Sequence, residues 1–121
     1  MSVRRALAAA ALAGVLPAAF ALGSGDVERG RRLFKEQGCP QCHGFGGRGD
    51  GYLLPMLKER PEMRDWTDRK ALEEFDDDSL AEIIAKGGEA LGRSKVMLRY
   101  SHKLDREQIR DLVAFIRSLA R

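Results

Sequence analysis

Histidine and cysteine are scarce in this sequence, which has two of each among its 121 residues. A structural zinc site needs four ligands, and only His102 lies outside the short segment that contains the other three, so such a site is disfavoured. No run of β-branched residues alternates with polar ones, and no repeat or interdomain linker is present, so strands are not predicted. The length leaves room for one domain.

Net charge of either sign is also low. The formal net charge of the whole chain is +3, and removing residues 1–21 takes away two arginines and no acidic residue, which leaves +1. A nucleic-acid partner is recognised by a strongly basic domain. We therefore expect no nucleic-acid partner.

The first 21 residues have the pattern of a secretory signal peptide. Two arginines precede a run rich in Ala, Leu and Val over residues 6–22, and this run contains the small-residue cleavage pattern Ala19-Phe20-Ala21. An uncleaved membrane anchor is the alternative, but 17 residues is the lower limit for a spanning helix, and a glycine and a proline interrupt the run. We predict a signal peptide over residues 1–21 and an exported, periplasmic protein that begins at Leu22.

The remaining 100 residues, 22–121, are predicted to form one domain. Chains of this size bury a small hydrophobic core, so a disulfide or a bound cofactor commonly adds to their stability. Two cysteines in an exported protein are ordinarily read as one disulfide. Here the spacing of the cysteines favours another role.

Both cysteines lie in the pentad Cys39-Pro40-Gln41-Cys42-His43, and C-x-x-C-H is the signature of c-type haem attachment. Positions i, i+3 and i+4 share one face of a helical turn, so both sulfurs and the imidazole point the same way. Cys39 and Cys42 can then hold a haem by two thioether bonds while His43 reaches its iron. A thioredoxin-like pair would need a βαβ context, which the flanking sequence lacks, and a simple disulfide leaves His43 unexplained.

Four segments have helical patterns, so we predict an all-α fold. The last segment is the clearest, because Asp105 and Gln108 resemble a capping box and apolar residues follow at helical spacing. The other three helices are expected over about residues 24–38, 68–75 and 76–87. The apolar positions of the last helix are Ile109, Leu112, Val113, Ile116 and Leu119.

With the pentad, four further segments make residues 26–119 resemble class I cytochromes c of the small bacterial type. These segments are Arg48-Gly49-Asp50-Gly51, residues 61–68, the helix end at Gly87-Gly88, and residues 112–117. The resemblance implies a cytochrome c fold in which about four helices pack around one covalently bound haem c. It also implies that Gly30 packs against Phe115, and that the carbonyl of Tyr52 or Pro55 accepts the second N–H of the haem-binding histidine.

In that family, a methionine in the loop before the last helix is the second axial ligand of the iron, and Met97 occupies this place. Leu98 follows it where the family usually has proline. Met56 and Met63 are rivals in an earlier irregular stretch, and His102 would give a bis-histidine iron but lies in a polar turn. The resemblance implies that Met97 and the pentad histidine are the axial ligands.

With both axial positions filled, no coordination site stays open for oxygen or a substrate, and a thioether opposite an imidazole favours reduced iron. These features predict a periplasmic one-electron carrier rather than an enzyme. An open or labile sixth position would instead give a haem enzyme or a gas or redox sensor, and Leu98 is the one feature that favours this. Another possibility is the subunit through which electrons reach a larger oxidoreductase.

Charge is unevenly distributed along the chain. Residues 86–106, which include Met97, hold six basic and two acidic side chains, a net formal charge of +4. Residues 59–82 hold ten acidic and four basic side chains, a net formal charge of −6. We expect redox proteins as partners, with an acidic partner docking on the basic face near Met97. Membrane contact is expected only through a membrane-bound redox partner.

Overall fold

The computed structural model describes Ala10, Gly14 and residues 25–121, and within these it contains five α-helices, two 3₁₀-helices and no β-strand. The helices are α1 (Val27–Glu36), α2 (Pro40–His43), α3 (Arg69–Glu73), α4 (Asp77–Lys86) and α5 (Arg106–Ser118). The 3₁₀-helices are η2 (Leu54–Met56) and η3 (Glu89–Leu91). The predicted all-α class is confirmed. No helix among the described residues is long and apolar enough to span a membrane.

The helices lie where the sequence predicts them, with small differences. α1 ends at Glu36, before Gly38, which has a φ of +74° that glycine adopts without strain. α3 has five residues, inside the predicted range 68–75, and the pentad contributes the additional helix α2. The predicted signal peptide, residues 1–21, and the predicted start at Leu22 lie outside the described residues, apart from Ala10 and Gly14.

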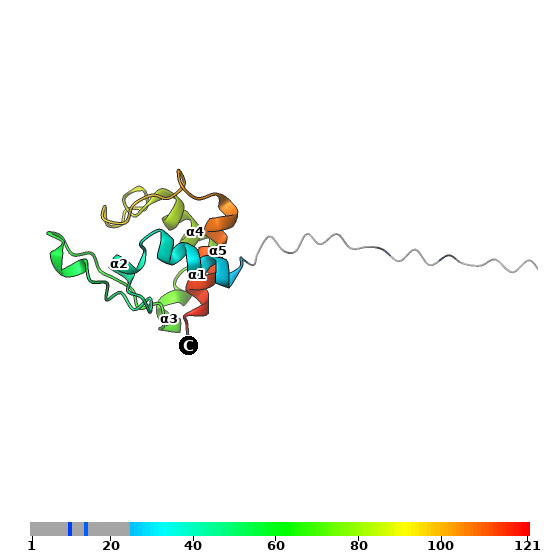
Figure 1. Ribbon diagram of the computed structural model, residues 1–121, viewed down its shortest axis with the longest axis horizontal. Coiled ribbons are helices and arrows are strands. Elements are labelled where there is room, and N and C mark those ends of the chain that lie inside the picture. The colour runs from blue at the N-terminus through cyan, green and yellow to red at the C-terminus, as the bar shows by residue number, and fades with distance from the viewer. Residues whose placement is uncertain (1–9, 11–13, 15–24) are drawn as a thin grey trace, which may run out of the picture.

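α1 and α5 cross in direct contact (Figure 1). A Cβ atom on Gly30 of α1 would lie 1.9 Å from the carbonyl oxygen of Asp111 and 2.8 Å from Cβ of Phe115. Only glycine allows this approach, and the implied contact between Gly30 and Phe115 is present. Phe34, one turn further along α1, is buried with its ring centroid 5.1 Å from that of Phe115.

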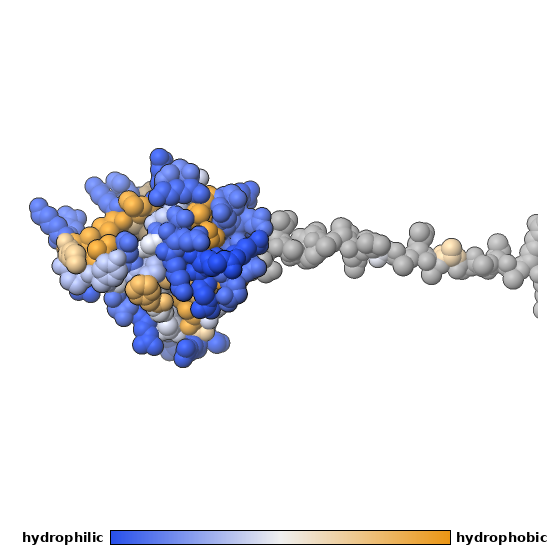
Figure 2. Space-filling model, in the orientation of Figure 1, coloured by the Kyte–Doolittle hydropathy of each residue, from blue (hydrophilic) through white to orange (hydrophobic). Residues whose placement is uncertain are grey.

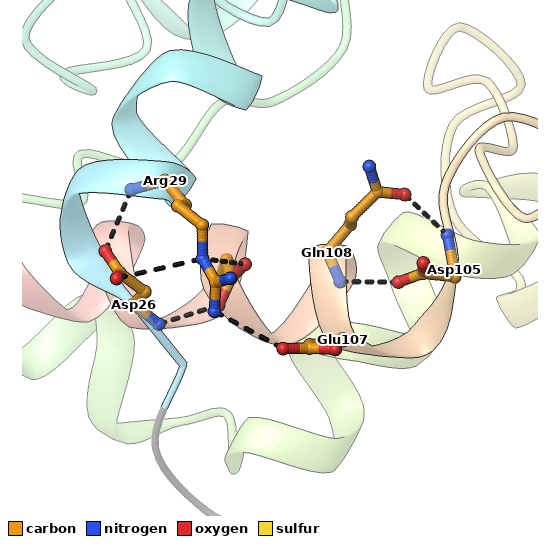
Figure 3. A network of polar contacts seen from close by, with 6 residues as sticks. Asp26, Arg29, Asp105, Glu107 and Gln108 are labelled. Carbon is orange, nitrogen blue, oxygen red and sulfur yellow. Dashed lines mark hydrogen bonds and ion pairs between the residues drawn. The ribbon is translucent and has the colours of Figure 1, made fainter.

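A polar network joins the first turns of α1 and α5 (Figure 3). Asp26 caps α1 by accepting a hydrogen bond from the backbone N–H of Arg29 at 3.0 Å. Asp111 of α5, which is 2 % exposed, accepts one from the backbone N–H of Asp26 at 2.7 Å. The Arg29 guanidinium lies 3.2 Å from the Asp111 carboxylate and 3.3 Å from that of Glu107. The predicted capping box of α5 is also present.

The core lies where α1, α3, α4 and α5 meet. Its buried residues are Phe34, Leu72, Leu80, Ile84, Leu104, Ile109, Leu112, Val113, Phe115 and Ile116. Arg117 of α5 fastens the corner between α3 and α4. Its guanidinium donates to the carbonyl of Leu72 at 2.9 Å, to the carbonyl of Phe75, and to the carboxylate of Asp77 at 2.7 Å. This corner is therefore fixed to the last helix.

Candidate functional site

The pentad folds into a helical turn just after α1. The backbone N–H of Cys39 donates to the carbonyl of Phe34 at 3.1 Å, and that of His43 donates to the carbonyl of Cys39 at 3.0 Å. Pro40 occupies the first turn of α2, where a backbone donor is not needed. The thiols of Cys39 and Cys42 are free and partly buried. The pentad thus forms the helical turn that its spacing predicts.

The chain that follows α2 folds back onto it. The N–H of Gly49 donates to the carbonyl of His43 at 2.8 Å, and that of Gly51 donates to the carbonyl of Cys42 at 3.0 Å. A Cβ atom on Gly51 would lie 2.2 Å from the carbonyl oxygen of Gln41, so a larger residue cannot approach this closely. The glycine-rich loop therefore fixes the pentad turn from outside.

One pocket of about 20 Å³ contains the predicted ligands from both halves of the chain. Cys39 and His43 line it from the pentad turn, and Met97 lines it from the loop between η3 and α5. The other lining residues are Phe34, Trp66, Ile84, Tyr100, Leu112 and Ile116. Because most of these side chains are apolar, the pocket shields the imidazole and the thioether from water.

The rival ligands lie elsewhere. The Met56 side chain is 74 % exposed, His102 is exposed, and Met63 is partly buried but does not line the pocket. Among the described histidine and methionine residues, His43 and Met97 are the two that line it.

The end of α4 holds the segment 88–101, which we call the Met97 loop. The N–H of Gly88 donates to the carbonyl of Met97 at 2.9 Å, and the N–H of Tyr100 donates to the carbonyl of Ile84 at 3.0 Å. Gly87 has a φ of +81°, and a Cβ atom there would lie 2.9 Å from the carbonyl oxygen of Met97. The glycines that end α4 therefore also let the Met97 loop pass close beside the helix.

His43 is neutral at ordinary pH. Burial lowers its pKa to about 4, and iron coordination requires this uncharged imidazole. Its Nδ1 atom is buried without a hydrogen-bond partner. The expected hydrogen bond to the carbonyl of Tyr52 or Pro55 is therefore wrong for this structure. The imidazole instead stacks on the ring of Trp66, with centroids 4.2 Å apart and planes 20° apart, and this contact sets its orientation.

Sequence reasoning assigned no role to two aromatic residues of the pocket, Trp66 and Tyr100. Burial raises the pKa of Tyr100, with smaller contributions from Cys39 and Cys42. The sequence feature that could have indicated Tyr100 is its position three residues after the predicted iron ligand, Met97. For Trp66, the sequence gives no indication that its ring reaches the pentad.

Cys39, His43 and Met97 line the pocket, whereas Cys42, on the same helical turn, does not. Together these residues fit a covalently bound haem. Cys39 and Cys42 supply two free thiols, and His43 and Met97 present a neutral imidazole and a thioether, which are ligands that c-type haem iron takes. Burial raises the pKa of Cys39 to about 11, which keeps this thiol protonated before attachment.

Comparison with known proteins identifies the family. The family model for cytochrome c matches residues 27–120. Among solved structures, the c-type cytochrome KustC0563 is 25 % identical, with a TM-score of 0.58, and the match covers 76 % of this chain and 98 % of that chain. No protein of curated function matches the chain. The chain therefore belongs to the cytochrome c family, and it is a haem c electron-transfer protein.

Proposed function

We propose that this protein is a periplasmic one-electron carrier whose haem iron is held by His43 and Met97. One observation carries the ligand assignment: a single apolar pocket is lined by both side chains, while Met56, Met63 and His102 do not line it. We also assign the two thioether bonds to Cys39 and Cys42, which the pentad places on one helical turn.

Haem bound here supplies one-electron exchange between ferrous and ferric iron. The chain contributes the rest. His43, kept neutral by burial, offers a lone pair without first losing a proton. Met97 offers a soft thioether, which raises the reduction potential, and the apolar lining limits the access of water to both groups. With both positions occupied by protein, the iron has no site for a substrate.

The Met97 loop supports a carrier over a sensor or an enzyme with a labile sixth ligand. Leu98 stands in place of the proline that is usual in the family, and its side chain is 66 % exposed. The N–H of Tyr100 nevertheless bonds this loop to Ile84 of α4, and the N–H of Gly88, just after α4, closes the loop on the carbonyl of Met97. These bonds give the loop the order that a proline ring would otherwise provide.

The pattern of residues 1–21 supports export to the periplasm, where a c-type haem is attached outside the cytoplasm. Mass spectrometry of the protein from a periplasmic extract tests this. We expect a mature chain that starts at Leu22 and carries one haem. A chain that retains residues 1–21 in the membrane fraction would instead indicate an anchor.

For docking, we propose an acidic redox partner on the face around the Met97 loop. Apolar surface (orange) lies on the left in Figure 2, over the loops that follow α2 and α4. In the Met97 loop, Leu98 is exposed next to Arg99, which has no ion-pair partner among the described residues. A free cation beside exposed apolar surface is suited to steer and then bind an acidic partner.

Salt dependence tests the docking proposal. We expect electron transfer with the partner to slow as ionic strength rises from about 0.01 M to about 0.15 M, because the Debye length falls from roughly 30 Å to 8 Å. Arg99→Gln should weaken this dependence, and Arg69→Gln, on the acidic side, serves as a control. Rates that do not change with salt would contradict the proposal.

The ligand proposal is tested on the holoprotein. We expect haem to remain with the chain after acid–acetone extraction, and we expect the reduced protein to bind carbon monoxide poorly. Ready carbon monoxide binding by the wild-type protein would show an open or labile sixth position, and it would favour the sensor or enzyme.

A further inference from the structure

The ring of Phe75 lies between two guanidinium groups. The central carbon of Arg93 lies 4.7 Å from the ring centroid, and that of Arg64 lies 5.5 Å from it. Both distances are within the range of cation–π attraction, about 6 Å. Arg93 belongs to the Met97 loop and Arg64 to the segment before α3. A single aromatic ring therefore contacts two segments that lie far apart in sequence.

Phe75 is a fixed point for these contacts. It lies at the corner between α3 and α4, and its carbonyl accepts a hydrogen bond from Arg117 of α5. The neighbouring Glu74 is ion-paired with Arg64 at 2.6 Å. The corner is thus tied to the last helix on one side and to the segment before α3 on the other, so the ring cannot follow the Met97 loop if this loop moves outward.

Arg93 connects the outer part of the Met97 loop to this fixed point. Within residues 89–96, the other polar contacts stay inside the loop: Lys95 pairs with Glu89 at 3.8 Å, and the N–H of Val96 donates to Ser94 at 3.1 Å. The guanidinium of Arg93 has no ion-pair partner among the described residues. Of the polar and ring contacts that the structure describes, the one between Arg93 and Phe75 joins residues 89–96 to the body of the fold.

We propose that the contact between Arg93 and Phe75 holds the Met97 loop closed and so keeps Met97 on the haem iron. This proposal rests on the proposed ligation by Met97. Arg93 and Phe75 act as positioning residues, because neither lines the pocket. Without the contact between Arg93 and Phe75, the Met97 loop is attached only where it meets the end of α4. The fraction of molecules in which Met97 has left the iron then rises.

Imidazole binding to the oxidised holoprotein measures that fraction. An added ligand binds only when Met97 is off the iron, so its apparent affinity is proportional to the open fraction. We expect Arg93→Gln to raise this affinity two- to fivefold, which is about 0.5–1 kcal/mol at 1.4 kcal/mol per tenfold. Phe75→Leu should give a similar increase, and the double variant should bind imidazole no more tightly than the stronger single variant.

Arg31→Gln is the matched control. Arg31 is also an exposed arginine over an aromatic ring, with its central carbon 5.3 Å from the centroid of Phe115, but it lies on α1. We expect this variant to bind imidazole as the wild type does. A general loss of stability would raise imidazole affinity in both arginine variants, and would overturn the proposal.

The two proposals fail in different ways. If the wild-type protein lacks methionine ligation, its spectrum shows this before any variant is made. If Met97 is the ligand and Arg93→Gln binds imidazole with wild-type affinity, then the Arg93 contact does not control the loop. Additive effects of Arg93→Gln and Phe75→Leu would likewise overturn the proposed contact.

Discussion

Replacing Gly30 with alanine tests the crossing of α1 and α5, which places Phe34 at the pocket. A Cβ atom would lie 1.9 Å from the carbonyl oxygen of Asp111, whereas a carbon–oxygen contact is normally about 3.3 Å. Because this oxygen belongs to the backbone, no change of rotamer relieves the clash, and the helices separate by roughly 1 Å or more. Overpacking of this kind costs about 1–3 kcal/mol.

Helix propensity opposes this cost, because alanine is favoured over glycine inside a helix by about 1 kcal/mol. We expect the clash to dominate and the melting temperature of the holoprotein to fall by about 4–8 °C for each net kcal/mol. Gly46→Ala is the control, because the nearest atom to its Cβ is the side chain of Arg48 at 4.0 Å. If Gly30→Ala proved as stable as the wild type, the close crossing would be refuted.

Three further predictions concern stability. Asp111→Ala leaves the backbone N–H of Asp26 without its acceptor and should lower the free energy of unfolding by about 1–3 kcal/mol. Glu107→Gln, at the exposed end of the network, should change it little. Unfolding in guanidinium chloride measures both values. Hydrogen bonds at turns and helix caps lower the pKa of three carboxyl groups below the ordinary value of 3.8. The stability that these ionised groups contribute is therefore complete above pH 3.8 and is lost as the pH falls through their pKa in the folded protein. Titration by NMR measures these pKa values. These carboxyls are Asp26, Asp65 and Asp76. Replacing both Cys39 and Cys42 with alanine should remove the haem and leave a largely disordered chain, and a cooperative thermal transition in that haem-free variant would contradict this.

Much of the fold follows from local sequence signals. The capping box at Asp105 and the apolar spacing after it predict α5, and the buried positions of that helix confirm the pattern. The pentad predicts a helical turn because its chemistry requires one. Gly30 and Phe115 meet as the resemblance implies.

The parts that sequence could not provide depend on distant residues. Asp111 is buried in α5 because it binds the backbone of Asp26, 85 positions earlier, and no local pattern marks this carboxyl as internal. The stacking of His43 on Trp66 likewise arises from tertiary packing, and it replaces the hydrogen bond that the resemblance implied. The contact between Arg93 and Phe75 is of the same kind.

The most direct test of this account is the weak long-wavelength sulfur-to-iron charge-transfer band of the oxidised holoprotein. We predict that the wild type shows this band and that Met97→Ala loses it, with a fall in reduction potential. Met56→Ala, Met63→Ala and His102→Ala should keep the band. A wild-type protein without the band, or a Met97→Ala variant that retains it, would contradict the ligation of haem iron by Met97.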